Sequence, residues 1–256
     1  MDIFKNFDTY SLKARVFPAL IAGLPTLALL FVIVPWDHLG IPHAIAVSMG
    51  MVLLFAFADL ARSRGKRIQT KMGTGATPEQ WYRGNPDIPE GSKNRFRSFV
   101  ANQLKQTAPT AEQEKADSFE ANDFYLSANA WLRDHTYDTS QYGILFGENI
   151  TYGFRRNLLG LKGIALTFNS FVLTTCTLIM YFRPNYFEGL ASLEEKLAIT
   201  MLAVVLHSMF MIFAVNELAV REASRSYGRQ LILSCEKLMR SRQATTKQEG
   251  NSDGDD

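Results

Sequence analysis

Four apolar runs of membrane-spanning length constrain this chain more than any other feature of its sequence. A bilayer core about 30 Å thick is crossed by roughly 20 residues of α-helix. Runs of that length lie at Phe17–Trp36, Ile41–Leu60, Leu161–Phe182 and Leu197–Val215. Helices in the core of a water-soluble protein rarely extend so far without charge. The sequence therefore predicts an all-α membrane protein with four transmembrane helices arranged as two hairpins.

The first apolar run is expected to stay in the protein as a helix rather than to be removed as a signal peptide. It follows a polar N-terminus that contains Asp2 and Asp8, and it lacks a clear small-residue cleavage site. Pro18 falls in its expected first turn, where a missing N–H has little effect. Pro25 lies inside the run and predicts a kink, with neighbouring helices covering the carbonyl that the proline leaves free.

The distribution of Lys and Arg predicts the side of the membrane for each polar segment, because cytoplasmic loops are enriched in these residues. The link Asp37–Gly40 has neither, and the loop after the third run has only Arg183 and Lys196. We therefore expect a multi-pass protein of the bacterial inner membrane with its N-terminus, central block and C-terminus in the cytoplasm. The basic residues of those three segments that flank the runs are Lys5, Lys13, Arg15, Arg62, Arg64, Lys66, Arg67, Arg155, Arg156, Arg221, Arg225 and Arg229.

Composition and periodicity divide the chain into membrane and cytoplasmic segments. Within the central block, helical spacing predicts one helix from Ser92 and a second after a capping box at Thr110–Gln113. No helix breaker follows Asn216, so the fourth membrane helix is expected to continue into the cytoplasm, and its apolar stripe from Tyr227 must pack on the central domain or on a second copy. The expected segments are 1–60 with transmembrane helices 1 and 2, 61–158 as a cytoplasmic helical domain, 159–219 with transmembrane helices 3 and 4, 220–243 as a cytoplasmic amphipathic helix, and 244–256 as a disordered tail.

Residues that commonly carry catalysis or bind metals are sparse. The two cysteines, Cys176 and Cys235, fall in different segments, and none of the four histidines has metal-ligand spacing with another histidine or cysteine. No phosphate-binding loop, nucleophile elbow or dinucleotide fingerprint occurs. We therefore expect no metal site and no cofactor, and an enzyme is the weaker interpretation.

Polar residues at the apolar runs are the candidates for a pore or gate, because such groups are costly in a membrane. Asp59, Asn216 and Glu217 belong at the cytoplasmic ends of their helices, where rings of acids in an oligomer would favour cations. The alternative is that they only reach the lipid headgroups. Asn169 and His207 lie deeper, either lining a pore or, as we favour, bonding between helices.

Two clusters mix basic and aromatic residues near the membrane boundary. Arg and Lys hold phosphates, and aromatic rings stack on bases. Both clusters are therefore candidate nucleotide-binding sites, although anchoring at the membrane surface explains the same composition. The candidate residues are Lys93, Arg95 and Arg97 in one cluster and Tyr152, Phe154, Arg155, Arg156 and Asn157 in the other.

Two stretches, Asp8–Leu20 and Glu148–Lys162, resemble a family of bacterial four-helix membrane proteins. The layout of the chain also resembles the transmembrane effectors of nucleotide-signalling anti-phage defence systems of the CBASS and Hailong type. That resemblance implies a partner nucleotidyltransferase, which makes a nucleotide or oligonucleotide ligand, and an effector that permeabilises the inner membrane.

These observations support two main hypotheses. In the first, the protein is a lipid-embedded homo-oligomer that forms an ion channel or pore, gated when a nucleotide binds its cytoplasmic domain. Ligand binding would then act on the third membrane helix through the connector Gly153–Lys162. In the second, the protein is a non-conducting membrane scaffold or sensor that recruits a cytoplasmic partner.

Overall fold

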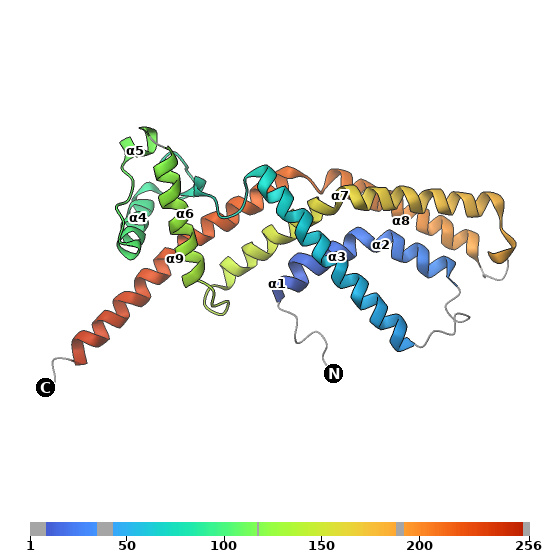
Figure 1. Cartoon of the computed structure of the whole chain (residues 1–256), viewed down its shortest axis with the longest axis horizontal. Coiled ribbons are helices and arrows are strands. Elements are labelled where there is room, and N and C mark those ends of the chain that lie inside the picture. The colour runs from blue at the N-terminus through green and yellow to red at the C-terminus, as the bar shows by residue number, and fades with distance from the viewer. Residues whose placement is uncertain (1–8, 35–42, 117, 188–191, 253–256) are drawn as a thin grey trace. The chain divides into compact units, whose positions relative to one another are not determined.

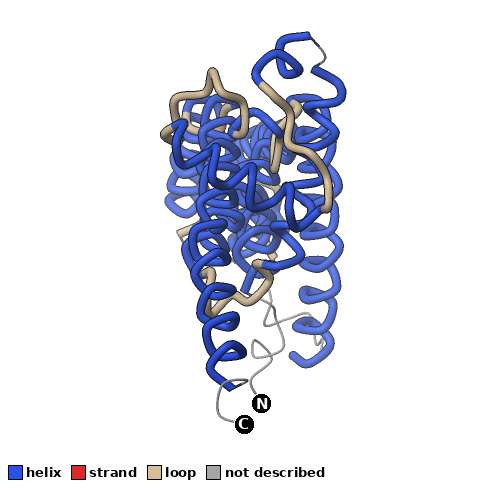
Figure 2. The backbone as a smooth tube through the Cα atoms, turned by 90° about the vertical axis from the view of Figure 1, so that its left-hand side faces the viewer, coloured by secondary structure: helices blue, strands red, loops and turns tan. Residues whose placement is uncertain are grey.

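The computed structural model describes residues 9–34, 43–116, 118–187 and 192–252, and these ranges contain helices and loops but no strand (Figure 2). The chain divides into two compact units. The first, here named the apolar unit, comprises Met1–Met72 and Gly153–Val220. The second, the polar unit, comprises Gly73–Tyr152 and Arg221–Asp256.

Long helices make up the apolar unit (Figure 1). Three of them, Thr9–Ile33, Gly143–Phe182 and Leu193–Phe213, are long and apolar enough to cross a membrane, as expected for the first, third and fourth runs. The second expected span begins at residues 41 and 42, which lie outside the described residues, and α3 is not among these candidates. The elements are α1 (Thr9–Ser11), the π-helical turn η2 (Leu12–Val16), α2 (Phe17–Ile33), α3 (His43–Met72), α7 (Gly143–Phe182), the short η5 (Asn185–Phe187), α8 (Leu193–Phe213) and the first turn of α9 (Glu217–Ser252).

The outer surface of the apolar unit is itself apolar. Phe31 of α2, Val52 and Leu53 of α3, Phe171 of α7 and Phe213 of α8 are all at least 64% exposed. Water-soluble proteins rarely expose so many large apolar side chains on neighbouring elements. An exposed apolar surface of this kind is compatible with helices that cross a membrane, as are their length and composition.

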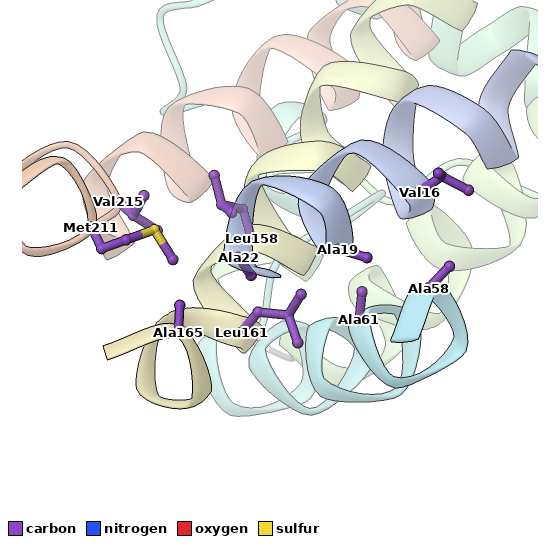
Figure 3. Packing of buried hydrophobic residues seen from close by; sticks show 10 residues of the cluster. All are labelled: Val16, Ala19, Ala22, Ala58, Ala61, Leu158, Leu161, Ala165, Met211 and Val215. Carbon is purple, nitrogen blue, oxygen red and sulfur yellow. The ribbon is translucent and has the colours of Figure 1, made fainter. Parts of the chain in front are cut away.

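Small side chains let the helices of the apolar unit approach closely. Ala19 and Ala22 of α2 and Ala61 of α3 are buried beside Leu161 and Ala165 of α7 (Figure 3). Between membrane helices the hydrophobic effect adds little, so association depends on close packing of this kind and on polar contacts. The small side chains of this core therefore allow the backbones of neighbouring helices to approach closely.

The polar unit is built from helices of different lengths around an aromatic core. Trp81 is fully buried, stacks on Tyr125 and donates from Nε1 to Asn129 Oδ1 at 2.9 Å. The expected capping box is confirmed, because the Thr110 and Gln113 side chains each accept the other's backbone N–H. The elements are η4 (Pro78–Gln80), α4 (Glu90–Leu104), α5 (Ala111–Ala116), α6 (Ser118–His135), the first ten residues of α7, and α9 from Arg221.

Several helix ends differ from the sequence-based expectation. Helix α4 begins at Glu90, two residues before Ser92. Helix α8 ends at Phe213 and α9 begins at Glu217, so the fourth apolar run does not continue into the C-terminal segment as one uninterrupted helix. Helix α9 extends to Ser252, past the expected end at 243.

The apolar stripe of α9 packs within the polar unit, which is the first of the two alternatives left by the sequence. Leu231, Ile232 and Cys235 are completely buried, and Ser224 Oγ accepts the N–H of Gly75 at 2.7 Å. Lys237 Nζ donates to the carbonyl of Gln141 at 2.7 Å. The C-terminal helix and the central block therefore form one folded unit.

Candidate functional site

Two prolines of the first apolar helix each remove a backbone donor. In a regular α-helix, the N–H groups missing at Pro18 and Pro25 would bond the carbonyls of Ala14 and Ile21. As expected, Pro18 lies in the first turn of α2, although helical structure already begins at Thr9. The π-helical turn Leu12–Val16 comes directly before it. Both carbonyls accept hydrogen bonds from side chains of other helices.

His207 of α8 hydrogen-bonds to the carbonyl of Ile21, which lacks a backbone donor because of Pro25. Its Nε2 lies 3.0 Å from Ile21 O, and because a carbonyl only accepts, Nε2 carries the proton. On the other side of the ring, Nδ1 lies 3.0 Å from Asn169 Nδ2 and 3.3 Å from Asn169 Oδ1. Asn169 also donates to Ser208 Oγ at 2.8 Å. This network joins α2, α7 and α8 inside the apolar unit, so within one chain Asn169 and His207 bond between helices, the interpretation that we favoured.

Asn157 of α7 satisfies the other carbonyl. It is completely buried, and its Nδ2 donates to Ala14 O at 2.6 Å. Arg156 supports it by donating from Nε to Asn157 Oδ1 at 3.3 Å, and Arg156 also bonds the Gln69 side chain of α3. A Cβ atom on Gly65 of α3 would lie 1.9 Å from Asn157 Oδ1, so only glycine leaves room for this amide. Asn157 therefore acts as a packing and hydrogen-bonding residue.

The break between α8 and α9 is held by polar side chains of the apolar unit. Lys162 Nζ donates to Ile212 O at 2.9 Å and to Val215 O at 2.8 Å, which satisfies carbonyls at the end of α8. Asn216 Oδ1 accepts the N–H of Ala219 at 2.9 Å as the N-cap of α9. Arg155 donates to Ala219 O at 3.0 Å. A pocket of about 200 Å³ lies at this junction, lined in part by Phe154 and Arg155.

The two acidic candidates are both on the surface of the apolar unit. Glu217 is paired with Lys71 at 4.0 Å, and Asp59 is exposed on α3. The Glu217 pair is solvent-exposed, so it contributes little to stability. Both carboxylates remain accessible to ions or to a second copy.

A row of hydroxyl groups, not predicted from the sequence, runs along the exposed face of α7. Thr167, Ser170, Thr174 and Thr177 are all exposed and recur every three or four residues. Each donates to the carbonyl four residues earlier, at 2.8–3.0 Å. The signal was present as this spacing within an apolar run. The row places acceptor oxygens along an otherwise apolar exterior.

The candidate nucleotide-binding residues are divided between the two units. Tyr152 belongs to the polar unit, where it stacks on Tyr227 and lies 3.0 Å from Thr74 Oγ1, whereas Phe154 to Asn157 belong to the apolar unit. Lys93 and Arg97 are buried in the polar unit. Arg95 is exposed and pairs with Glu236 at 3.6 Å.

Within the described ranges, no three His, Cys, Asp or Glu side chains are grouped so that they could hold a metal ion. The features that could serve a function are therefore the polar contacts between apolar helices, the exposed hydroxyl row of α7 and the salt bridges of the polar unit. Comparison with known protein families, with curated protein sequences and with solved structures found no match.

Proposed function

We propose that this protein is a four-helix inner-membrane effector that forms a homo-oligomeric ion channel or pore controlled by its polar unit. In this proposal α3 is the second transmembrane helix, and the N-terminus, polar unit and C-terminus are cytoplasmic. The basic residues that flank the apolar runs support this orientation. The resemblance to anti-phage effectors supplies the setting, in which a partner nucleotidyltransferase makes the activating nucleotide or oligonucleotide.

The hydroxyl row of α7 is the observation that carries the proposal. A hydroxyl group forms no favourable polar contact with lipid tails. It can hydrogen-bond to water or to a neighbouring helix, and its oxygen can coordinate an ion. A row with three- and four-residue spacing stays on one face of a helix, so copies of α7 around an axis would line a path with Thr167, Ser170, Thr174 and Thr177. Each hydroxyl donates to its own helix, so its oxygen lone pairs remain to receive cations or water.

Helix α7 also supplies a route for control, because it begins in the polar unit at Gly143 and ends in the apolar unit at Phe182 without interruption. A ligand that binds one arrangement of the polar unit more tightly would bias the rotation or tilt of this helix. The contacts of Asn157 with Ala14 and of Asn169 with His207 are polar bonds of α7 that such a movement would have to remake.

The test is potassium flux from liposomes that contain the full chain, measured with and without nucleotides. Thr174→Val keeps the side-chain shape and removes the hydroxyl, so flux should fall by about tenfold as the path becomes apolar. Thr151→Val is the matched control, since Thr151 makes the same bond to Gly147 O on α7 but lies in the polar unit. Equal flux from both variants would contradict the proposed path. Absence of flux, together with a co-purifying cytoplasmic protein, would instead identify a scaffold.

Topology needs a separate measurement. A cysteine-reactive reagent that does not cross membranes should label a cysteine placed at residues 37–40 from the periplasm and one placed at Thr151 only after lysis. Labelling of both positions from the same side would contradict a four-span arrangement.

A further inference from the structure

Three cationic side chains of the polar unit converge on one carboxylate at the start of α4. Lys93 Nζ lies 3.1 Å from Glu90 Oε2, and Arg97 bonds Glu90 Oε1 through both terminal nitrogens. Arg83 Nε lies 3.8 Å from the same Oε1. These four residues, Arg83, Glu90, Lys93 and Arg97, are here named the α4 cation cluster.

Burial in this cluster is unequal. The side chains of Lys93 and Arg97 are 1% and 2% exposed, whereas that of Glu90 is 41% exposed. Arg83 has a second acidic partner in Glu114, but Glu90 is the one carboxylate within salt-bridge distance of Lys93 or Arg97 among the described residues. Buried cations require an anion nearby. The Glu90 side chain is partly exposed as a whole, although its Oε2 is buried and makes no hydrogen bond to the residues that the structure describes. Lys93 Nζ also donates to the carbonyls of Tyr82 and Asn85.

The position of Glu90 is also a general anion site. Glu90 is the first residue of α4, whose N-cap Pro89 makes no side-chain cap, so the free N–H groups and the helix dipole favour negative charge there. The buried Arg97 Nε has no hydrogen-bond partner in the part of the chain that the structure describes. The carboxylate therefore leaves a donor unused that a larger anion with more oxygen atoms could engage.

Glu90 is held in its ionised form. Partial burial alone would raise its pKa, but the hydrogen bond from Arg97 and the positive charges of Arg97 and Lys93 outweigh that effect, and the pKa lies below its ordinary value of 4.5. At neutral pH the cluster therefore holds a negatively charged group.

We propose that the α4 cation cluster is a phosphate-binding site and that Glu90 occupies it as an internal substitute for the phosphate group of a ligand. A phosphate would take the place of the carboxylate between Lys93 and Arg97 while Glu90 turns to solvent. Arginine and lysine bind phosphate oxygens through charge-assisted hydrogen bonds, and a phosphate carries more charge than a carboxylate. This inference rests on the proposed function, because it assigns the contact for the activating nucleotide.

The test is calorimetric titration of the purified full chain with inorganic pyrophosphate and with ATP in phosphate-free buffer. Glu90→Gln removes the competing charge, so affinity should rise by about tenfold or more. Glu236→Gln is the matched control, because Glu236 is 39% exposed, is paired with Arg95 and lies in the same unit. Glu90→Asp keeps the charge but reaches less far, so its affinity should fall between those of the parent and Glu90→Gln. Lys93→Met should abolish binding while near-ultraviolet circular dichroism confirms that the chain is folded.

The source of the phosphate is distinguished by a parallel titration with short-chain phosphatidic acid, since a lipid-headgroup site would bind it more tightly than ATP. If Glu90→Gln itself loses structure, its melting temperature in pyrophosphate should return to that of the parent. Unchanged affinity in Glu90→Gln, or an equal gain in Glu236→Gln, would overturn the inference. Binding without flux would overturn the channel alone, whereas nucleotide-activated flux without binding at this cluster would overturn the inference alone.

Discussion

Replacing Gly160 with alanine would test the close approach of α3 and α7 that organises the apolar unit. A Cβ atom on Gly160 would lie 2.7 Å from the carbonyl carbon of Arg64 and 2.8 Å from the backbone nitrogen of Gly65. Normal contacts between such atoms are about 3.5–4.0 Å. Both neighbours are backbone atoms, so no rotation of a side chain relieves the clash, and the two helices must separate by roughly 1 Å.

The expected magnitude follows from two opposing effects. Overpacking of a well-packed site costs about 1–3 kcal/mol, and a clash with backbone belongs at the upper end. Alanine in place of glycine returns about 1 kcal/mol of helix propensity. Gly160→Ala should therefore lower the free energy of unfolding by about 2 kcal/mol. Gly163→Ala is the control, because a Cβ there meets nothing within 4 Å. Its free energy of unfolding should rise by about 1 kcal/mol through helix propensity alone.

The two variants should thus differ by about 3 kcal/mol, or roughly 6–12 °C in melting temperature for a chain of this length. Thermal unfolding in detergent, followed by circular dichroism, measures the difference. Melting temperatures for Gly160→Ala and Gly163→Ala that agree within about 2 °C would refute the close approach, since both changes carry the same helix propensity.

Three further predictions concern the polar contacts. His207→Leu should lower the free energy of unfolding by about 1–3 kcal/mol, because the carbonyl of Ile21 loses its partner. Pro25→Ala restores a backbone N–H for that carbonyl, so a double-mutant cycle should show coupling of about 0.5–3 kcal/mol, and additive effects would contradict the pairing. Asn216→Ala should destabilise the start of α9 by about 0.5–2 kcal/mol, which hydrogen exchange at its first turn would report as faster exchange. The pKa of Glu90 is lower in the folded protein, so the stability that its ionised form contributes is present above pH 4.5 and is lost as the pH falls through the folded pKa. Glu90→Gln should therefore flatten this part of an acid denaturation curve. An unchanged curve would count against the ion pairs.

Local features of the chain were predicted well because their partners are near in sequence. The capping box at Thr110 and Gln113 spans three residues, and both of its hydrogen bonds are present. The apolar runs that form α2, α7 and α8 were identified from length and composition alone, since the bilayer thickness sets the length of a spanning helix.

The burial or exposure of individual polar side chains was harder to predict. Lys93 and Arg97 were predicted as phosphate ligands near the membrane boundary, but the sequence did not show that both side chains are buried beside Glu90. Nothing in the local spacing distinguishes an exposed cation from one whose carbon chain enters a core. The hydroxyl row of α7 was overlooked for the opposite reason, because hydroxyl residues in an apolar run are compatible with burial, lipid contact or a water-filled path.

The sequence by itself determined that this chain forms long apolar helices and a separate polar block. The apolar surface and the charge of each segment can be summed directly from its residues, without knowledge of their partners. The sequence also located the donors that Pro18 and Pro25 remove. Only the tertiary structure decided that Asn157 and His207 satisfy the affected carbonyls, across 143 and 186 residues of chain. A hydrogen bond requires two groups to meet within about 3 Å, and the chain order leaves that meeting undetermined until the helices pack.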